Sequence, residues 1–420
     1  MSSNNWTTGT LGDVTFEEKT RLKQPTANCP IYGVDNNVGL TTSPKYVAED
    51  LSRYKRIHPG MFAYNPMRLN IGSIGYCSKK HSSGLVSPDY IVFRCDESRL
   101  DPDYFSCFIK STEWSDWTES SGEGSVRVRI YYRELAEMPI NLPTLSEQRA
   151  IARILGALND NIEVNRQMNK TLEAMARALF KSWFVDFDPV RAKSEGRDTG
   201  LPREISELFP SSFEDSELGR VPKGWGIGCV DDEFDLTMGQ SPPGDTYNEA
   251  GEGLPFYQGR TDFGFRFPTR RVYCTAPTRL AKAGDTLISV RAPVGDINMA
   301  AEECAIGRGV AAARHKTGSR SYTFQFMQSI EPVFAQFEAE GTVFGAIGKK
   351  DFHAIECVVS PKKLILAFEA KASVLDAQIE LNELETRTLT ALRDTLLPRL
   401  MSGQLRVPEA EQKLAEESKA

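Results

Sequence analysis

Two segments of this chain, residues 144–183 and 361–400, match each other without a gap at a shift of 217. The matched pairs include Leu158 with Leu375, Ile162 with Ile379, Asn165 with Asn382, Leu172 with Leu389, and Leu179 with Leu396. A match of this length without insertions indicates an internal duplication rather than chance similarity.

Both segments have the apolar spacing of a long helix. The matched residues follow one another at intervals of three, four or seven, which is typical of a coiled-coil seam. Asn165 and Asn382 occupy the same place in the two seams, and a buried Asn lowers stability while it specifies register and partner. We expect the two helices to pack against each other. The alternative is that each helix packs only on its own globular part.

The repeat continues outside the helices, with shifts of 219 to 225 that loop insertions would produce. It pairs Trp6 with Trp225, Tyr32 with Tyr257, Gly75 with Gly295, and Arg94 with Arg314. The sequence therefore predicts a globular part followed by a helix, occurring twice. The predicted boundaries are a first globular part at 1–143, a first helix at 144–185, a polar linker at 186–217, a second globular part at 218–360, a second helix at 361–402, and a frayed tail at 403–420.

Short β-type runs and helical stretches alternate in both globular parts, which predicts mixed α and β structure. Strands are expected at 90–94, 125–132, 285–291 and 356–359, and helices near 103–112 and 321–339. No window has eighteen apolar residues in a row, and the first ten residues lack the pattern of a secretory signal, so we expect a cytoplasmic protein. The eight Cys are widely separated and only four His are present, so we expect reduced thiols and no metal site.

Two basic stretches stand out against the net charge of −7. Between residues 51 and 88 the chain has six basic residues and no acidic one, namely Arg53, Lys55, Arg56, Arg68, Lys79 and Lys80. Between residues 258 and 291 basic residues again dominate, and we select Arg260, Arg266, Arg270, Arg271 and Arg291. Positive charge attracts phosphate, and arginine reads guanine edges, so these eleven residues are predicted DNA contacts. The alternative is a solvated surface face.

No motif predicts catalysis, so we name no catalytic residue. Asn65-Pro66-Met67 lacks the second proline and the aromatic residue of an adenine methyltransferase motif. The acidic pair Asp186 and Asp188 precedes Pro189 and is read as a helix end. With four scattered His, no nucleophile–base arrangement is indicated.

Several segments are similar to a known family over essentially the full length. The longest, LPTLSEQRAIARILGALNDNIEVNRQMNKTLEAMARALFKSWFVDFDPV at 142–190, resembles the central region of the specificity subunits of type I restriction–modification enzymes. DSELGRVPKGW at 215–225 resembles the entry to the second recognition domain of that family. TMGQSPPGDTYNE, SVRAPVG and CAIGRGVAA in the second half and YNPMRLNIGSIG in the first are also similar.

The resemblance implies a non-catalytic subunit of α+β fold, with two target-recognition domains joined by two long helices in an antiparallel coiled coil. Each domain would read one half of a bipartite, asymmetric site in double-stranded DNA. The helices would set the gap and dock two methyltransferase subunits, with motor–nuclease subunits joining them. S-adenosylmethionine, ATP and magnesium would be bound by the partners and not by this chain. The alternative function is a DNA-binding scaffold that does not read bases.

Overall fold

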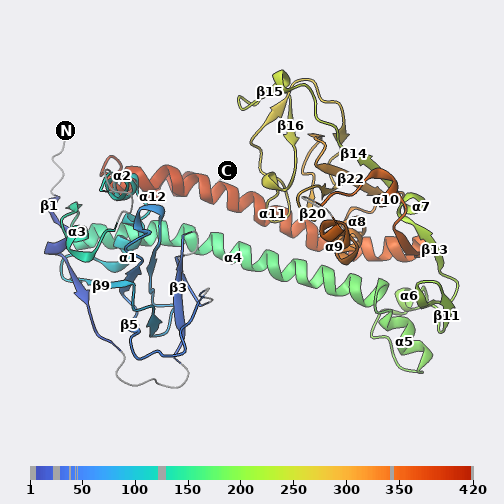
Figure 1. Cartoon of the computed structure of the whole chain (residues 1–420), viewed down its shortest axis with the longest axis horizontal. Helices are drawn as coiled ribbons and strands as arrows, with labels where there is room; N and C mark the ends of the chain where they lie inside the picture. Colours follow the sequence, from blue (N-terminus) through green and yellow to red (C-terminus); the bar gives the residue numbers. More distant parts are fainter. Residues whose placement is uncertain are drawn as a thin grey trace. The chain divides into compact units, whose positions relative to one another are not determined.

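The computed structural model describes residues 6–21, 29–36, 39–42, 44, 46–121, 129–340 and 345–417, with the side chains of 339, 340 and 413–417 excepted. The chain forms two compact units (Figure 1). Unit 1 consists of Met1–Val164 together with Glu385–Ala420, and unit 2 consists of Asn165–Leu384. The division differs from the predicted order of parts, because each unit combines a globular part with half of each long helix.

Unit 1 contains two four-stranded sheets. The first has the order β2-β9-β6-β7, with β2 at Thr15–Glu18, β9 at Ile91–Cys95, β6 at Met61–Tyr64 and β7 at Ile74–Tyr76, all antiparallel. The second has the order β4-β3-β8-β5, with β4 at Gly39–Thr41, β3 at Ile31–Asp35, β8 at Gly84–Val86 and β5 at Lys55–Ile57. Strands β3 and β8 are parallel. The remaining elements are β1 (Thr7–Thr10), which pairs with β10 (Pro139–Leu142), and the helices α1 (Pro102–Phe108), α2 (Thr112–Ser120) and α3 (Tyr132–Ala136).

Unit 2 repeats this plan with longer insertions. Its four-stranded sheet has the order β14-β22-β19-β20, with β14 at Phe234–Met238, β22 at Val310–His315, β19 at Thr286–Val290 and β20 at Val294–Met299. Its second sheet has the order β15-β17-β16-β21-β18, with β15 at Tyr247–Asn248, β17 at Tyr273–Cys274, β16 at Leu254–Tyr257, β21 at Cys304–Ile306 and β18 at Leu280–Ala281. Strand β13 (Gly226–Cys229) pairs with β23 (Glu356–Val359). Helices α7 (Val230–Glu233), α8 (Arg320–Ser329), α9 (Glu331–Glu340) and α10 (Lys349–His353) complete the unit.

The residues that the sequence matched lie at equivalent places in the two sets of sheets. Arg94 of β9 lies opposite Phe16 of β2, and Arg314 of β22 lies opposite Asp235 of β14. Each second sheet holds one parallel pair, β3 with β8 and β16 with β21, and Tyr32 and Tyr257 lie in these pairs. Unrelated sequences rarely share both strand order and strand direction, so the two units have a common topology.

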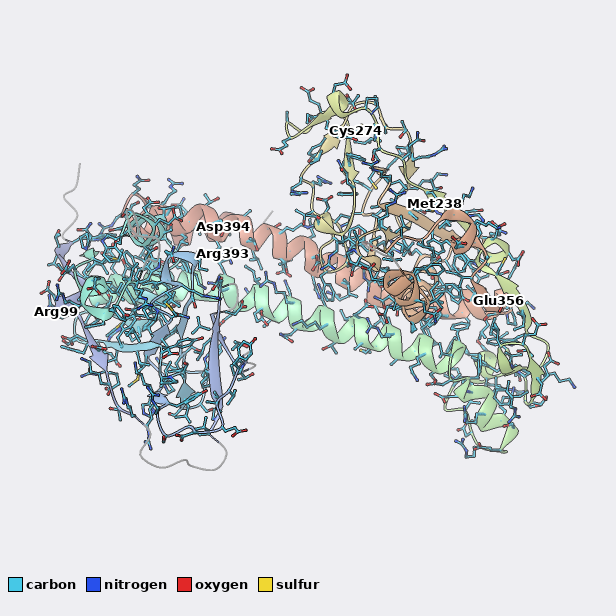
Figure 2. The ribbon with its side chains drawn as sticks, in the orientation of Figure 1. Arg99, Met238, Cys274, Glu356, Arg393 and Asp394 are labelled. Carbon is cyan, nitrogen blue, oxygen red and sulfur yellow. The ribbon has the colours of Figure 1, made fainter. Side chains whose placement is uncertain are left out.

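Two helices have 40 residues each, α4 at Leu145–Phe184 and α11 at Lys362–Met401. Each of them contributes residues to both units. Pro143 and Pro361 stand just before them, where proline limits backward extension of a helix. In unit 1, Arg393 Nη1 donates to Asn159 Oδ1 at 3.1 Å (Figure 2). In unit 2, Asn382 Nδ2 donates to Asn169 Oδ1 at 2.8 Å, and the Phe368 ring lies 5.6 Å from that of Phe180. Within unit 2, residue numbers rise along α4 as they fall along α11, so the helices run in opposite directions there.

The ten predicted seam residues are buried to different extents. Six are buried, namely Leu158, Ile162, Asn165, Ile379, Asn382 and Leu396. The other four, Leu172, Leu179, Leu375 and Leu389, are half-buried. The cores around the helices also differ. In unit 1 the long helices contribute aliphatic side chains to the core, such as the fully buried Leu155 and Leu400, whereas in unit 2 they contribute the aromatic Trp183 and Phe368.

Three local predictions were wrong in the described residues. The strand expected at 125–132 lies partly outside them, and its last residue, Tyr132, begins α3. The linker contains α5 (Asp188–Ser194), α6 (Arg203–Ser206) and a hairpin of β11 (Phe213–Ser216) with β12 (Gly219–Pro222), and Phe209 packs on Trp183. The tail forms α12 (Val407–Glu417), because Ala410 is buried in the core of unit 1.

Candidate nucleic-acid interface

Five of the six predicted DNA contacts in unit 1 are exposed. Arg53 and Arg56 lie before and within β5, Arg68 precedes a short turn after β6, and Lys79 and Lys80 follow β7. Lys55 is half-buried, its Nζ donates to the Tyr90 carbonyl, and burial lowers the pKa of its ammonium group. The Lys55 side chain therefore makes a structural contact inside unit 1 and is less available to DNA than the exposed cations.

The exposed cations of unit 1 differ in their partners. Lys80 Nζ lies 2.6 Å from Asp160 Oδ1 on α4, and Lys79 lies 4.0 Å from Asp103. Among the residues that the structure describes, Arg53, Arg56 and Arg68 form no salt bridge. An arginine without a carboxylate partner loses no ion pair when it meets a phosphate. These three arginines are therefore the candidate phosphate contacts of unit 1 that would give up the least on binding.

Four predicted contacts in unit 2 are exposed, and three of them are held by carboxylates. Arg260 pairs with Asp296 at 3.1 Å, Arg270 with Glu302 at 2.6 Å, and Arg271 with Asp262 at 2.8 Å. The fourth, Arg291, is exposed and forms no salt bridge within the described part of the chain. A guanidinium has five N–H donors, so an arginine held by one carboxylate keeps donors for a base edge or a phosphate. The ion pairs hold the three arginine side chains in fixed directions, and the carboxylates reduce the local positive charge.

Arg266 does not fit the prediction of a DNA contact. Its side chain is 1% exposed, and its guanidinium pairs with Glu173 of α4 and Asp376 of α11. It also lies over the Phe324 ring, with Cζ 4.0 Å from the ring centroid. A side chain enclosed in this way cannot reach DNA while the fold is intact, so we correct its assignment from a DNA contact to an internal ion pair.

Sequence reasoning missed Glu173 and Asp376, the two partners of Arg266. Asp376 is 5% exposed and Glu173 is 12% exposed by side chain. A signal was present for Asp376, because it lies four residues after Ala372 on an otherwise apolar row of the helix. Buried acidic residues are rare unless they are paired, so a charge at such a position indicates a buried cation nearby.

Burial makes several of the thiols of this protein poor nucleophiles. All eight Cys are free, and six of them are buried. Burial raises the pKa of Cys77 and Cys107 to about 11, and that of Cys304 and Cys357 to about 12. A thiol with such a pKa stays protonated at neutral pH, and the thiolate is the reactive form. The described residues also contain no group of three or more His, Cys, Asp or Glu placed to hold a metal ion.

None of the helices in the described part of the chain combines the length and apolar character needed to cross a bilayer. The structure thus has exposed arginines on two units of common topology, together with two long helices. Exposed arginines make each unit a candidate nucleic-acid-binding surface.

Comparisons with known proteins show which proteins this chain resembles. Residues 3–174 match the model of the type I restriction modification DNA specificity domain. The putative type I restriction enzyme MjaX specificity subunit of Methanocaldococcus jannaschii is 28% identical over 372 residues, which cover 86% of this chain and 81% of that protein. The HindI specificity subunit of Haemophilus influenzae is 23% identical, over 84% of this chain and 88% of that protein. This chain is therefore similar to type I restriction enzyme specificity subunits over most of its length.

A solved structure supports the fold independently of close sequence similarity. The S subunit of a type I restriction–modification system from M. genitalium has a TM-score of 0.61 and 15% identity, covering 95% of this chain and 97% of that one. At this identity the likeness concerns the fold alone. It agrees with a mixed α/β chain that contains two long helices.

Proposed function

We propose that this specificity subunit reads a bipartite, asymmetric DNA site, one half with each unit. The observation that carries the proposal is the common topology of the two units combined with different charged surfaces. Unit 1 presents Arg53, Arg56 and Arg68 without salt bridges among the described residues, whereas unit 2 presents Arg260, Arg270 and Arg271 on carboxylates. A shared scaffold with different contacts suits two unlike sequences.

The recognition domains of this proposal are residues 1–143 and 218–360, in tandem repeat. The long helices act as a spacer in the form of an antiparallel coiled coil, in line with the buried Asn169–Asn382 hydrogen bond and the opposite helix directions in unit 2. A helix of 40 residues is about 60 Å long, which exceeds one turn of B-DNA at about 34 Å. The helices therefore set the unread gap between the half-sites.

The helices also offer a surface for partners. Several large apolar side chains of α4 and α11 in unit 2 are exposed, with Met168 at 42%, Met175 at 52%, Val374 at 67%, Leu381 at 59% and Leu384 at 61%. Apolar side chains gathered on a surface favour protein contacts. We propose that two methyltransferase subunits dock on the helices and that motor–nuclease subunits join them.

On this proposal the chain performs no chemistry itself. S-adenosylmethionine, ATP and magnesium are bound by the partner subunits, and this chain needs access to cellular DNA, which is the reason for placing it in the cytoplasm. The second candidate is a DNA-binding scaffold that does not read bases. The ion pairs of Arg260, Arg270 and Arg271 favour base reading, because fixed guanidinium groups suit directional hydrogen bonds better than diffuse phosphate attraction.

The first test maps methylated adenines in host DNA with and without the gene for this chain. We expect one bipartite motif to disappear on deletion. A methylation pattern that does not change would contradict the proposed function.

The second test compares the two sets of arginines in the host. Replacing Arg270 and Arg271 by Ala should relax the preference at one half-site, and replacing Arg53 and Arg56 should affect the other. Arg203→Ala is the control, because Arg203 is an exposed arginine that pairs with Glu207 on α6, outside both basic stretches. An equal loss of methylation at every target sequence, without any change in base preference, would favour the DNA-binding scaffold.

The third test shortens the spacer. Deleting seven residues from α4 shortens that helix by about 10 Å, which corresponds to about three base pairs. We expect a change in the tolerated gap between half-sites. If the gap stays the same, the helices do not act as a ruler.

A further inference from the structure

Arg266 connects a surface segment of unit 2 to both long helices at once. Its Nη1 donates to Asp376 Oδ1 of α11 at 2.5 Å, and its Nη2 donates to Glu173 Oε2 of α4. Arg266 is itself part of the segment Gly259–Val272, which contains the exposed arginines Arg260, Arg270 and Arg271. The buried arginine and the exposed arginines thus share one short stretch of chain.

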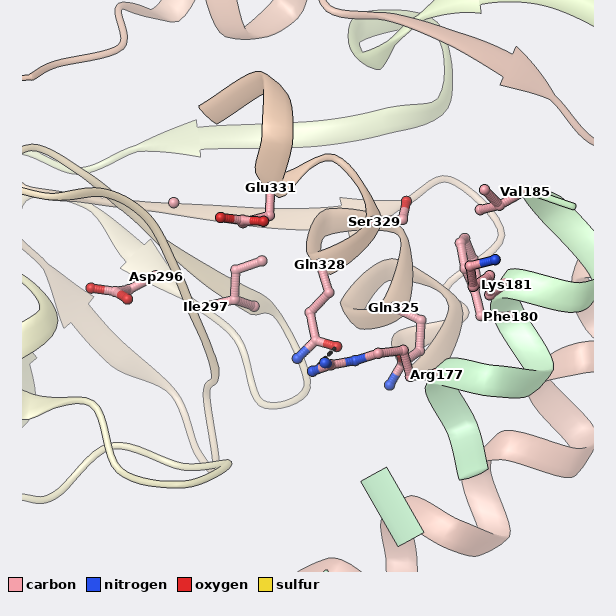
Figure 3. A pocket seen from close by; sticks show the side chains of 11 residues that line it. Arg177, Phe180, Lys181, Val185, Asp296, Ile297, Gln325, Gln328, Ser329 and Glu331 are labelled. Atoms are coloured by element: carbon pink, nitrogen blue, oxygen red, sulfur yellow. Dashed lines mark hydrogen bonds between the residues drawn. The ribbon is translucent and has the colours of Figure 1, made fainter. Parts of the chain in front are cut away.

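The neighbours of Arg266 strengthen this connection. Glu173 Oε1 accepts a hydrogen bond from Gln325 Nε2 of α8 at 3.1 Å. One turn further along α4, Arg177 Nη2 donates to Gln328 Oε1 at 3.3 Å, and Figure 3 shows both of these α8 glutamines beside Arg177. The ring of Phe324, also on α8, lies against the guanidinium of Arg266. Helix α8 therefore contacts both Glu173 and Arg266 of the ionic cluster.

The segment is also held to its own sheet and to itself. The Arg266 carbonyl accepts from the Met299 amide at 2.9 Å, and the Gly264 carbonyl accepts from Asn298 Nδ2 at 3.0 Å. Within the segment, the Thr269 amide donates to the Asp262 carbonyl at 2.7 Å, and Arg271 pairs with the Asp262 side chain. A displacement of Arg266 would therefore carry Arg270 and Arg271 with it.

Unit 1 has no such buried cation among its described residues. None of its described arginines and lysines is buried. In unit 1 a charged contact to α4 is the Lys80–Asp160 pair, in which the side chains are 74% and 60% exposed. The ionic connection through a buried arginine is thus a property of unit 2 and not of the shared topology.

We propose that Arg266 is a positioning residue that fixes the DNA-facing segment Gly259–Val272 against α4 and α11. It thereby sets where the second half-site lies relative to the spacer helices, and this inference rests on the proposed function. The planar fork of arginine can bind two carboxylates in fixed directions, which an ammonium group cannot. The residue acts through Arg260, Arg270 and Arg271 and does not touch DNA itself.

The test measures adenine methylation across the genome of hosts that carry chromosomal variants of the full chain. In Arg266→Gln we expect methylation at sites with one altered base in the second half-site, or with a gap changed by one base pair, to rise about tenfold relative to the intact motif. Preference at the first half-site should stay as in the parent, which gives a control within the same molecule. Arg266→Lys should give the same relaxation despite its retained charge.

Arg320→Gln is the matched control. Arg320 of α8 pairs with Glu380 of α11 at 3.9 Å, but its side chain is 39% exposed, so it offers the same ion types without burial. We expect this variant to keep both preferences and the gap. If it relaxes the second half-site as much as Arg266→Gln, the effect belongs to any contact between α8 and α11 and the proposal is wrong.

Two further outcomes are decisive. If Arg266→Gln prevents folding and all methylation disappears, Glu173→Gln replaces it, because that variant keeps Asp376 as a partner, and it should relax the second half-site to a smaller degree. Unchanged preference and gap in a variant that still methylates would overturn the positioning role. If deletion of the whole gene leaves methylation unchanged, the proposed function fails instead, so the two failures can be told apart.

Discussion

The two units share a topology but differ in how their sheets are joined to the long helices. In unit 1 the long helices contribute aliphatic side chains to the core, among them Ile151 and Leu155 of α4 and Leu400 of α11, and the Lys80–Asp160 pair is exposed. In unit 2 the long helices contribute aromatic side chains, and their Glu173 and Asp376 pair with the buried Arg266. Apolar burial is non-directional, whereas a guanidinium between two carboxylates specifies orientation. A duplicated fold can therefore keep its strand order while one copy gains a directional connection.

The sharpest way to remove this difference is Arg266→Leu. The buried Asp376 would lose its cation, and Glu173 would keep Arg177 at 4.0 Å, so the free energy of unfolding of unit 2 should fall by about 4 kcal/mol. Because the chain has two units, hydrogen exchange of peptides from each unit is the appropriate measurement. Peptides from the sheets of unit 1 should exchange as in the parent. A loss below about 1 kcal/mol would mean that the cluster is not a stabilising connection.

Leu155→Ala tests how much the aliphatic side chains of the long helices stabilise unit 1. Leu155 is fully buried, so the cavity and the lost burial should lower the free energy of unfolding of unit 1 by about 3 kcal/mol. Leu172→Ala is the comparison in unit 2, where the half-buried leucine should cost clearly less. The same exchange experiment checks both variants. Equal losses would show that the seam is packed equally along both helix halves.

Unit 2 also contains a buried histidine that makes its stability sensitive to acid. Burial lowers the pKa of His315 below its ordinary value of 6.5, although the hydrogen bond that its Nε2 donates to Glu233 acts in the opposite direction, and Lys316 and Lys362 lower it further. A folded-state pKa that is lowered means that the unfolded chain takes up the proton first. Stability is then complete above about pH 6.5 and decreases as the pH falls below it.

We therefore expect the urea midpoint of unit 2 to decrease from about pH 8 to about pH 5, and His315→Gln to flatten this decrease. The unit 1 midpoint serves as the internal reference. A variant with the same acid slope as the parent would contradict the assignment.

The smallest effect is expected for the exposed pair of unit 1. Lys80→Ala should change the free energy of unfolding by at most about 1 kcal/mol, and less at high salt, because solvent screens the Lys80–Asp160 attraction. Unfolding at low and high salt measures this. A loss of stability comparable to that of Arg266→Leu would mean that the exposed pair of unit 1 is as stabilising as the buried cluster of unit 2.

The helices were the most predictable part of the fold. Their expected ranges, 144–185 and 361–402, compare with Leu145–Phe184 and Lys362–Met401. Heptad spacing and flanking prolines are local signals, so they remain readable without knowledge of the rest of the chain. The order in the linker and tail was not foreseen, because Phe209 and Ala410 are buried by residues distant in sequence.

The candidate interface was predicted less well than the helices. Charge clustering selected eleven residues, and nine of them are exposed, whereas Lys55 is half-buried and Arg266 is fully enclosed. Arg266 stands between Phe265 and Phe267 and Arg270 between Thr269 and Arg271, but neither setting shows which carboxylates the guanidinium meets. Its partners Glu173 and Asp376 lie 93 and 110 residues away along the chain, so only folding brings the three charges together.

The sequence by itself determined the duplication, the two long helices and the resemblance to DNA-specificity subunits, because repeats, heptads and motifs depend on residues that are close together in the sequence. The tertiary structure alone decided which basic residues face solvent and which are held inside. Burial depends on what packs around a side chain, and for Arg266 those groups come from three helices that are far apart in the chain.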